Sequence, residues 1–253
     1  MSRRVSLGQH FLVDPHVVDE ILEIARPLPG ERFVEIGPGR GAMTGPLLDA
    51  GAIVDAVEID SALAGWLRGR WPNERMTVHV ADALEFDYAS VAAADLRLIG
   101  NLPYYLSTPL LFRLLEFAGI FRDITVMLQR EVAERLCAPP GSRRYGRLTV
   151  MASSRCRPEW CLAVGREAFR PRPKVESAVV RLVPDSGLRV EAPEVFERLV
   201  RQAFSQRRKT IANALRAMAS KEEIRAAGID PSQRPEQIAA AEFASLAEQL
   251  APT

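Results

Sequence analysis

The stretch NLPYY at 101–105 places an amide, a rigid bend and two aromatic rings directly after an apolar run. Pro103 fixes the local backbone, so that the carbonyl of Leu102 can be presented outward. This carbonyl and the amide oxygen of Asn101 can each accept one N–H of an exocyclic amine, and Tyr104 offers a face for stacking. The group therefore suits a flat, polar ring such as adenine. A structural turn with buried tyrosines is the alternative.

A glycine-rich loop, GPGRGA at 37–42, lies between a short apolar strand and a helical stretch. Glycines in such a loop let the backbone approach a ligand closely, which makes Gly37 and Gly39 candidate cofactor-binding residues. Glu58 ends the next strand, 21 residues after Gly37. A carboxylate there can accept hydrogen bonds from both hydroxyls of a ribose. This pattern fits NAD and S-adenosylmethionine equally well.

Two further acids favour S-adenosylmethionine. Glu35 lies two residues before the loop, where a carboxylate would repel a pyrophosphate and attract a ligand that carries a sulfonium and an ammonium. Asp82 follows the third strand, and its carboxylate can accept a hydrogen bond from an adenine amino group. A helix N-cap is the structural alternative for Asp82. With the glycines and Glu58, the order of these residues predicts a methyl-donor site.

The NLPYY stretch would then end the fourth strand, beside the methyl donor. The lone pair of an adenine amino nitrogen is delocalised into the ring, and two acceptors on its N–H groups would localise it. Methyl transfer to carbon usually uses a cysteine, and transfer to an alcohol a metal or a strong base, but none of these lies nearby. Displacement at nitrogen needs mainly positioning and electrostatics. The stretch therefore favours transfer to an amino nitrogen.

A second ring could close the other face of the base, and Phe169 is the best candidate. It precedes a proline-rich basic segment that contains Arg170, Arg172 and Lys174. A base in paired RNA must be extruded to reach such a pocket, and RNA recognition favours loops and unstacked bases. The alternative for Phe169 is a core aromatic residue.

The elements that position these residues alternate along the chain. Apolar strands are expected at 33–36, 53–59, 76–80, 96–99, 124–128, 160–164 and 177–183, with helices between most of them. Ser61 is the expected N-cap of the helix after the second strand. The alternation predicts an α/β fold with a Rossmann-like, doubly wound and mostly parallel sheet. Ligands are expected at the carboxyl ends of its strands.

The turn cluster at 184–187 is the best domain boundary. Helices are expected beyond it at 193–204, 207–219, 221–227 and 235–250, without a further strand. We therefore predict a methyltransferase domain over residues 1–184 and a small, all-helical C-terminal domain over 185–253.

The net charge of +1 conceals an uneven distribution. Residues 31–95 carry 5 basic and 11 acidic side chains, whereas residues 130–181 carry 12 and 5. Residues 198–216 add 6 basic side chains and no acidic one. A basic latter half suits a polyanionic partner such as RNA. A solvated, arginine-rich surface is the alternative.

The composition excludes several classes of protein. The three cysteines, Cys137, Cys156 and Cys161, are spaced for neither a disulfide framework nor a zinc site, and the three histidines are too scattered for a metal site. No apolar run has the length of a membrane span, and the N-terminal sequence lacks an apolar signal core. We expect a cytoplasmic, monomeric protein without a metal.

Several strings in order resemble the small-subunit ribosomal RNA adenine dimethyltransferases, the KsgA or RsmA family. The resemblance covers essentially the whole chain. It rests on GQHFLVD (8–14), VEIGPGRGAMT (34–44), VEID (57–60), ADAL (81–84), GNLPYYLSTPLL (100–111), MLQREVAERL (127–136), YGRLTV (145–150), FRPRPKVESAVVRL (169–182) and AFSQRRKTIANAL (203–215).

The resemblance implies a Rossmann-like methyltransferase that uses S-adenosylmethionine. Its implied reaction is N6,N6-dimethylation of two adjacent adenosines in a hairpin loop near the 3′ end of 16S rRNA, within a precursor of the small ribosomal subunit. Donor contacts would map to His10, Leu12, Gly37, Glu58, Asp82 and Asn101. The target adenine would meet Asn101, Leu102, Pro103, Tyr104 and Phe169. The RNA would meet Arg143, Arg144, Arg147, Arg207, Arg208 and Lys209.

Two departures from the family pattern affect these expectations. The family commonly has asparagine where this chain has His10, so the donor contact would use the backbone or a ring nitrogen. The NLPYN string of bacterial members ends here in Tyr105, which we do not assign as catalytic.

The alternatives for the function of this chain are a related 23S rRNA adenine methyltransferase, a non-catalytic ribosome assembly factor, and an NAD-dependent oxidoreductase.

Overall fold

The computed structural model describes residues 10–72, 74–184 and 187–251. Residues 8 and 9 of the GQHFLVD string and part of the predicted turn at 184–187 lie outside this description. Contacts divide the chain into two compact units, Met1–Ala133 with Glu159–Pro184, and Glu134–Pro158 with Asp185–Thr253. The chain crosses from the first unit to the second after Pro184, which is the predicted boundary. Residues 134–158, predicted in the first domain, group with the C-terminal helices.

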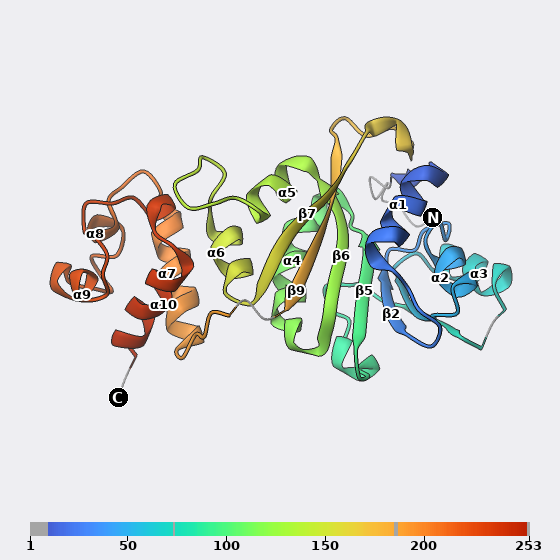
Figure 1. The fold of residues 1–253 in the computed structure, drawn as a ribbon, viewed down its shortest axis with the longest axis horizontal. Coiled ribbons are helices and arrows are strands. Elements are labelled where there is room, and N and C mark those ends of the chain that lie inside the picture. Colours follow the sequence, from blue (N-terminus) through green and yellow to red (C-terminus); the bar gives the residue numbers. More distant parts are fainter. Residues whose placement is uncertain (1–9, 73, 185–186, 252–253) are drawn as a thin grey trace, which may run out of the picture. The chain divides into compact units, whose positions relative to one another are not determined.

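The first unit is built on a seven-stranded sheet in the order β4-β3-β2-β5-β6-β9-β7 (Figure 1). Its pairings β2–β3, β2–β5, β3–β4 and β5–β6 are parallel, and β6–β9 is antiparallel. The strands are β2 (Arg32–Ile36), β3 (Ile53–Glu58), β4 (Met76–Val80), β5 (Leu96–Asn101), β6 (Phe121–Gln129), β7 (Cys156–Val164) and β9 (Ser177–Pro184). The predicted mostly parallel α/β sheet is confirmed.

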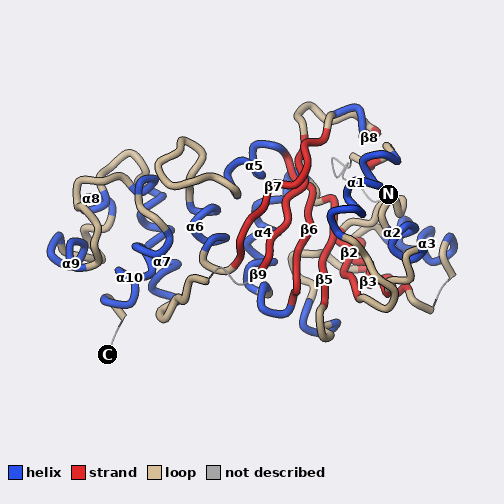
Figure 2. The backbone as a smooth tube through the Cα atoms, in the orientation of Figure 1, coloured by secondary structure: helices blue, strands red, loops and turns tan. Residues whose placement is uncertain are grey.

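Helices connect these strands and flank the sheet (Figure 2). They are α1 (Pro15–Ala25), α2 (Thr44–Asp49), α3 (Ser61–Arg70), α4 (Ser107–Glu116) and α5 (Arg130–Leu136), with 3₁₀ turns η1 (Tyr88–Val91), η2 (Tyr104–Leu106), η3 (Ala118–Ile120) and η4 (Arg166–Ala168). The predicted N-cap of α3 was wrong by one residue. Asp60 is the N-cap, because its carboxylate accepts from the backbone N–H groups of Ala62 and Leu63.

A two-stranded ribbon joins the N-terminal segment to the segment before β9. Strand β1 (Phe11–Leu12) pairs antiparallel with β8 (Phe169–Arg170), so that Leu12 lies opposite Phe169. Both side chains are buried in the core beneath the sheet. The sequence analysis predicted neither strand, nor helix α1. The ribbon places His10 and Phe11 beside the carboxyl ends of the central strands.

The second unit consists mainly of helices, as its C-terminal part was predicted to be. They are α6 (Arg147–Ser153), α7 (Pro193–Ser205), α8 (Ile211–Ala214), α9 (Lys221–Ala226) and α10 (Ala240–Gln249), with η5 (Pro235–Gln237). Helix α8 is shorter than the predicted 207–219 and begins at Ile211, where the N–H groups of Ile211 and Ala212 donate to carbonyls of Gln233 and Pro231. No helix in the described part of the chain has the length and apolarity that a membrane span requires.

Candidate functional site

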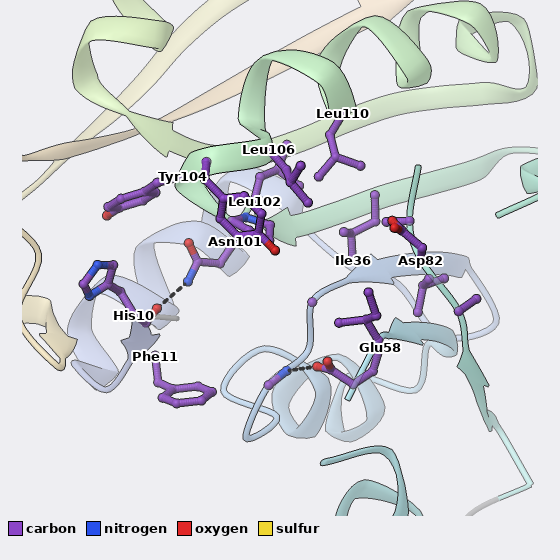
Figure 3. Close-up of a pocket in the computed structure, with 18 residues that line it drawn as sticks. His10, Phe11, Ile36, Glu58, Asp82, Asn101, Leu102, Tyr104, Leu106 and Leu110 are labelled. Carbon is purple, nitrogen blue, oxygen red and sulfur yellow. Dashed lines mark hydrogen bonds between the residues drawn. The ribbon is translucent and has the colours of Figure 1, made fainter. Parts of the chain in front are cut away.

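A pocket opens at the carboxyl ends of the central strands, and encloses about 790 Å³ when its open mouth is included. Ile36, Glu58 and Asn101 end β2, β3 and β5, and Asp82 follows β4. The full lining is His10, Phe11, Ile36, Gly37, Gly39, Val57, Glu58, Ile59, Ala81, Asp82, Ala83, Asn101, Leu102, Pro103, Tyr104, Tyr105, Leu106 and Leu110. Figure 3 shows Glu58 and Asp82 on one side, and His10, Asn101 and Tyr104 on the other.

The glycine loop and Glu58 hold one another in place. Gly39 has a φ of 55°, and a Cβ atom there would lie 3.0 Å from the Phe11 ring. Its backbone N–H donates to Oε2 of Glu58 at 3.2 Å, and the N–H of Asp60 donates to Oε1 at 2.9 Å. A carboxylate has about four acceptor positions, so each oxygen can still accept one further hydrogen bond. Glu58 therefore keeps the capacity to bind two hydroxyl groups.

Glu58 is 3% exposed. Burial raises its pKa, and the N–H groups of Asp60 and Gly39 act against this shift because they stabilise the ionised form. Asp82 uses only Oδ1 locally, where it accepts the N–H of Leu84 at 2.9 Å. Oδ2 of Asp82 accepts no hydrogen bond from the described residues. Asp82 can therefore stabilise the local turn through Oδ1 and still bind a ligand through Oδ2.

Glu35 is fully buried, and it does not line the pocket. Its Oε2 accepts the hydroxyl of Thr44 at 2.6 Å, whereas Oε1 has no hydrogen-bond partner among the described residues. Burial raises the pKa of Glu35 to about 7, the Thr44 hydrogen bond lowers it, and the nearby charge of Glu58 raises it. Any effect of Glu35 on a bound cation therefore acts through its charge and not through direct contact.

The amide of Asn101 is oriented by a main-chain acceptor. Its Nδ2 donates to the backbone carbonyl of His10 at 3.0 Å, shown as a dashed line in Figure 3. The amide oxygen accepts no hydrogen bond within the described residues and is available to a ligand. Because this contact uses the backbone of residue 10, it does not require the asparagine that is common in the family. The histidine ring itself is held by a bond between Nδ1 and the carbonyl of Pro171 at 2.7 Å.

The turn after Asn101 leaves one carbonyl without a partner. The carbonyl of Pro103 accepts the N–H of Leu106 at 2.9 Å and the hydroxyl of Ser107 at 3.1 Å. The carbonyl of Leu102 accepts none from the described residues, although its N–H donates to Met127. Leu102 lines the pocket and is 1% exposed, so its unpartnered carbonyl stays a candidate for the predicted second acceptor. Gly100 lets β5 pass close to β2 just before this turn, because a Cβ atom there would lie 2.8 Å from the carbonyl oxygen of Ile36.

The ring of Tyr104 is fixed at its far end. Its hydroxyl shares a hydrogen bond of 2.5 Å with the fully buried Ser177. Burial raises the pKa of the Tyr104 hydroxyl, and the Ser177 hydrogen bond lowers it. The ring lies 5.3 Å from the His10 ring between centroids, with their planes tilted by 36°. Ser177 thus fixes the position of the Tyr104 ring at the pocket wall.

The structure places two of the predicted site residues in the core, and Glu35 likewise lies outside the pocket lining. The Phe169 ring is fully buried, packs in the core and is absent from the pocket lining, so it offers no face to a base. Leu12 is 6% exposed and packs in the same core. Both side chains point inward because they face one another across the β1–β8 ribbon. The adjacent residue Phe11 lines the pocket instead.

The sequence analysis missed several lining residues. Phe11 contacts the glycine loop, and the guanidinium of Arg40 lies 5.2 Å from its ring centroid. Ile59 and Tyr105 line the pocket and are 49% and 56% exposed. Their positions in the sequence could have indicated this, because Ile59 directly follows Glu58 and Tyr105 directly follows Tyr104.

The predicted RNA-binding residues behave as two groups within the second unit. Arg143, Arg207 and Arg208 line one shallow pocket. Arg144 pairs with Glu134 at 2.9 Å, and Arg147 pairs with Glu197 at 3.1 Å. Lys209 is exposed and lies outside the lining of that pocket. The charges of the paired arginines are partly compensated, whereas the pocket is strongly basic.

A family model described as "Ribosomal RNA adenine dimethylase" matches residues 1–252. The chain belongs to this family. It is 49% identical to the ribosomal RNA small subunit methyltransferase A of Pseudomonas fluorescens strain Pf-5, over 98% of this chain and 94% of that protein. It is 48% identical to the protein of the same name from Thiobacillus denitrificans, over 98% of both chains.

Solved structures agree with this assignment. A dimethyladenosine transferase from Plasmodium falciparum superimposes with a TM-score of 0.79 at 26% identity, and the match covers 94% of this chain and 96% of that one. The 23S rRNA methyltransferase ErmE gives 0.74 at 28% identity, with coverages of 95% and 99%. The predicted fold, the family and the enzyme class, an rRNA methyltransferase, are confirmed.

Proposed function

We propose that the protein transfers methyl groups from S-adenosylmethionine to N6 of two adjacent adenosines in the 3′-terminal hairpin loop of 16S rRNA. We further propose that it acts in the cytoplasm, as a monomer, on a precursor of the small ribosomal subunit. The observation that carries the proposal is the pair of available acceptors at the end of β5, the amide oxygen of Asn101 and the carbonyl of Leu102. They match the two N–H groups of an adenine amine.

The residues on the acid side of the pocket fit the methyl donor. Glu58 would accept the ribose hydroxyls, Asp82 would accept the adenine amino group, and Gly37 and Gly39 leave room for close approach of the ligand. When bound, S-adenosylmethionine supplies an electrophilic methyl group on a sulfonium. In its ionised form, Glu35 places negative charge behind the loop, which favours a cationic ligand.

The residues on the opposite side act on the acceptor. Tyr104 would stack on the target base, and Ser177 keeps its ring in place. Before the first transfer, the Asn101 oxygen and the Leu102 carbonyl would each accept a hydrogen bond from one N–H of the amine, which pulls the nitrogen towards tetrahedral geometry and localises its lone pair. Each transfer releases one amine proton to solvent as the N–C bond forms and the S–C bond breaks. His10 fixes which atom of the Asn101 amide faces the substrate. This arrangement supplies orientation and electrostatics, which are what displacement at nitrogen requires.

In the second unit, we propose that Arg143, Arg207, Arg208 and Lys209 bind the RNA backbone. Arg144 and Arg147 contribute less, because carboxylates already pair with them. The carboxylate pairing and the shared pocket support this division of the six predicted residues.

The direct test is methyl transfer from labelled S-adenosylmethionine to small-subunit particles that lack the modification, followed by nucleoside analysis of the rRNA. We expect N6,N6-dimethyladenosine in the 3′ hairpin of 16S rRNA. Labelling of 23S rRNA alone would contradict the proposed substrate. Tight particle binding without transfer to either rRNA would instead indicate an assembly factor.

A further inference from the structure

Three segments that are distant in sequence meet in the arginine pocket of the second unit. Its lining consists of Gly141, Ser142, Arg143, Arg207, Arg208, Arg234 and Glu236. Nη2 of Arg207 donates to the carbonyl of Arg143 at 2.7 Å, and the N–H of Gly141 donates to the carbonyl of Glu236 at 2.6 Å. These bonds hold the three segments together, so the pocket is a built feature of this unit.

The charges in this pocket are unbalanced. Four guanidinium groups line it, but Glu236 is its only carboxylate. Within the described residues, the side chains of Arg143, Arg208 and Arg234 donate no hydrogen bond and form no ion pair. Guanidinium groups bind phosphate oxygens through two parallel N–H donors, more specifically than a point charge does. Arg234 was not among the residues that the sequence indicated.

Glu236 lies among these arginines, and one of its carboxylate oxygens accepts no hydrogen bond from the described residues. Its Oε2 is buried and has no hydrogen-bond partner among the described residues. The nearest cationic contact is Nε of Arg207 at 3.7 Å, which is an ion pair without a hydrogen bond. A buried carboxylate oxygen normally accepts hydrogen bonds, and leaving it without one is costly. Glu236, whose side chain is 20% exposed, therefore meets the pocket's arginines through its charge and not through a hydrogen bond.

We propose that Glu236 is an internal counter-ion in a site for a backbone phosphate of RNA, and that Arg234 is the fourth guanidinium of this site. The proposal rests on the proposed RNA substrate. In the free protein the carboxylate offsets part of the positive potential, and it repels a phosphate that enters the pocket. Glu236 thereby limits the affinity of the pocket for RNA, and favours release of the RNA after modification.

The test compares RNA affinity across three variants at several salt concentrations. Transcribed 16S rRNA is the probe, and its Kd is measured for the full chain with Glu236→Gln, Arg234→Ala or Glu222→Gln. The last is the matched control, because it removes the same charge from the same unit at an exposed position outside the pocket. Thermal unfolding midpoints establish that each variant is folded.

We expect Glu236→Gln to bind RNA about three- to tenfold more tightly at low salt, and Glu222→Gln to bind within about twofold of the unchanged protein. Arg234→Ala should bind more weakly, with a smaller slope of log Kd against log salt concentration. Equal affinities of folded Glu236→Gln and Glu222→Gln would overturn the counter-ion role. An unchanged slope for Arg234→Ala would remove Arg234 from the site.

A failure of this inference can be told apart from a failure of the proposed function. Methyl transfer by the unchanged protein is measured separately on small-subunit particles that lack the modification. Absence of transfer there would contradict the proposed reaction but would leave the variant Kd comparison valid. If the protein transfers methyl groups but the two glutamate variants have identical Kd values, the proposed reaction stands and the counter-ion role of Glu236 is wrong.

Discussion

The pocket of the first unit and the arginine pocket of the second differ in how their side chains are held. In the first, main-chain groups orient buried or half-buried side chains, such as Gly39 on Glu58 and His10 on Asn101. In the second, exposed guanidinium groups converge with few fixed partners. A preorganised site is suited to lowering a reaction barrier, whereas an exposed basic site supplies salt-dependent affinity. On the proposed function, the two units would divide chemistry from RNA binding.

Replacing Asn101 should produce the largest effect, and should separate the two functions most clearly. Asn101→Ala removes an oriented acceptor for the adenine amine, so we expect the rate constant for methyl transfer to fall about 100- to 1000-fold, by analogy with loss of one preorganised transition-state contact. Single-turnover assays at saturating RNA measure this rate. A fall of less than about fivefold would remove Asn101 from the reaction.

Burial of Glu35 should make stability depend on pH. Its pKa is about 7 in the fold and 4.5 ordinarily, so the unfolded chain loses this proton at lower pH than the folded chain. The contribution of protonated Glu35 to the free energy of unfolding is therefore fully present below pH 4.5. It is lost as the pH rises through about 7, which lowers the free energy of unfolding by about 3 kcal/mol. Urea unfolding of the unchanged protein and Glu35→Gln at pH 5 and pH 8 measures this difference. A pH-independent difference between them would refute it.

Glu58 should determine the affinity for the methyl donor and not that for RNA. Glu58→Ala removes two ribose acceptors and the partner of the Gly39 N–H, so we expect Kd for S-adenosylmethionine to rise about 100-fold, from hydrogen bonds to a charged group. Calorimetry measures it, with the exposed Glu85→Gln as control. Unchanged donor affinity would contradict the assignment of this side of the pocket.

The two groups of predicted RNA-binding arginines should differ in salt dependence. Arg207→Ala with Arg208→Ala should weaken RNA binding by about tenfold and lower the salt slope by about 1.5 to 2. Arg144→Ala with Arg147→Ala should change the slope by less than half as much, because carboxylates pair with both residues. Equal slopes for the two double variants would erase the distinction between the pocket and the paired surface.

Replacing Phe169 should have the smallest effect on methyl transfer, and it tests whether this residue belongs to the core or to the site. Phe169→Leu keeps a buried apolar side chain, so we expect a loss of about 1–2 kcal/mol in the free energy of unfolding, and methyl transfer within about threefold. Denaturant unfolding and single-turnover assays measure these two quantities. A large loss of transfer with unchanged stability would restore the stacking role that the sequence suggested.

The sequence predicted the site best where strand order determines position. Glu58, Asp82 and Asn101 were placed correctly in the pocket lining because parallel strands end at one edge of the sheet. It failed at the β1–β8 ribbon, which joins two-residue strands from distant segments and has no usable periodicity. That pairing turns Leu12 and Phe169 into the core and Phe11 towards the pocket. Arg234 and Glu236 could not be found either, because only tertiary contacts bring them to Arg207.

The most direct test of the division between the units measures two quantities on two variants. Single-turnover rate constants at saturating RNA and Kd values for RNA are compared for Asn101→Ala and for Arg207→Ala with Arg208→Ala. The account predicts a crossed result, in which the first lowers mainly the rate constant and the second raises mainly Kd. A parallel loss of both quantities in both variants would contradict it.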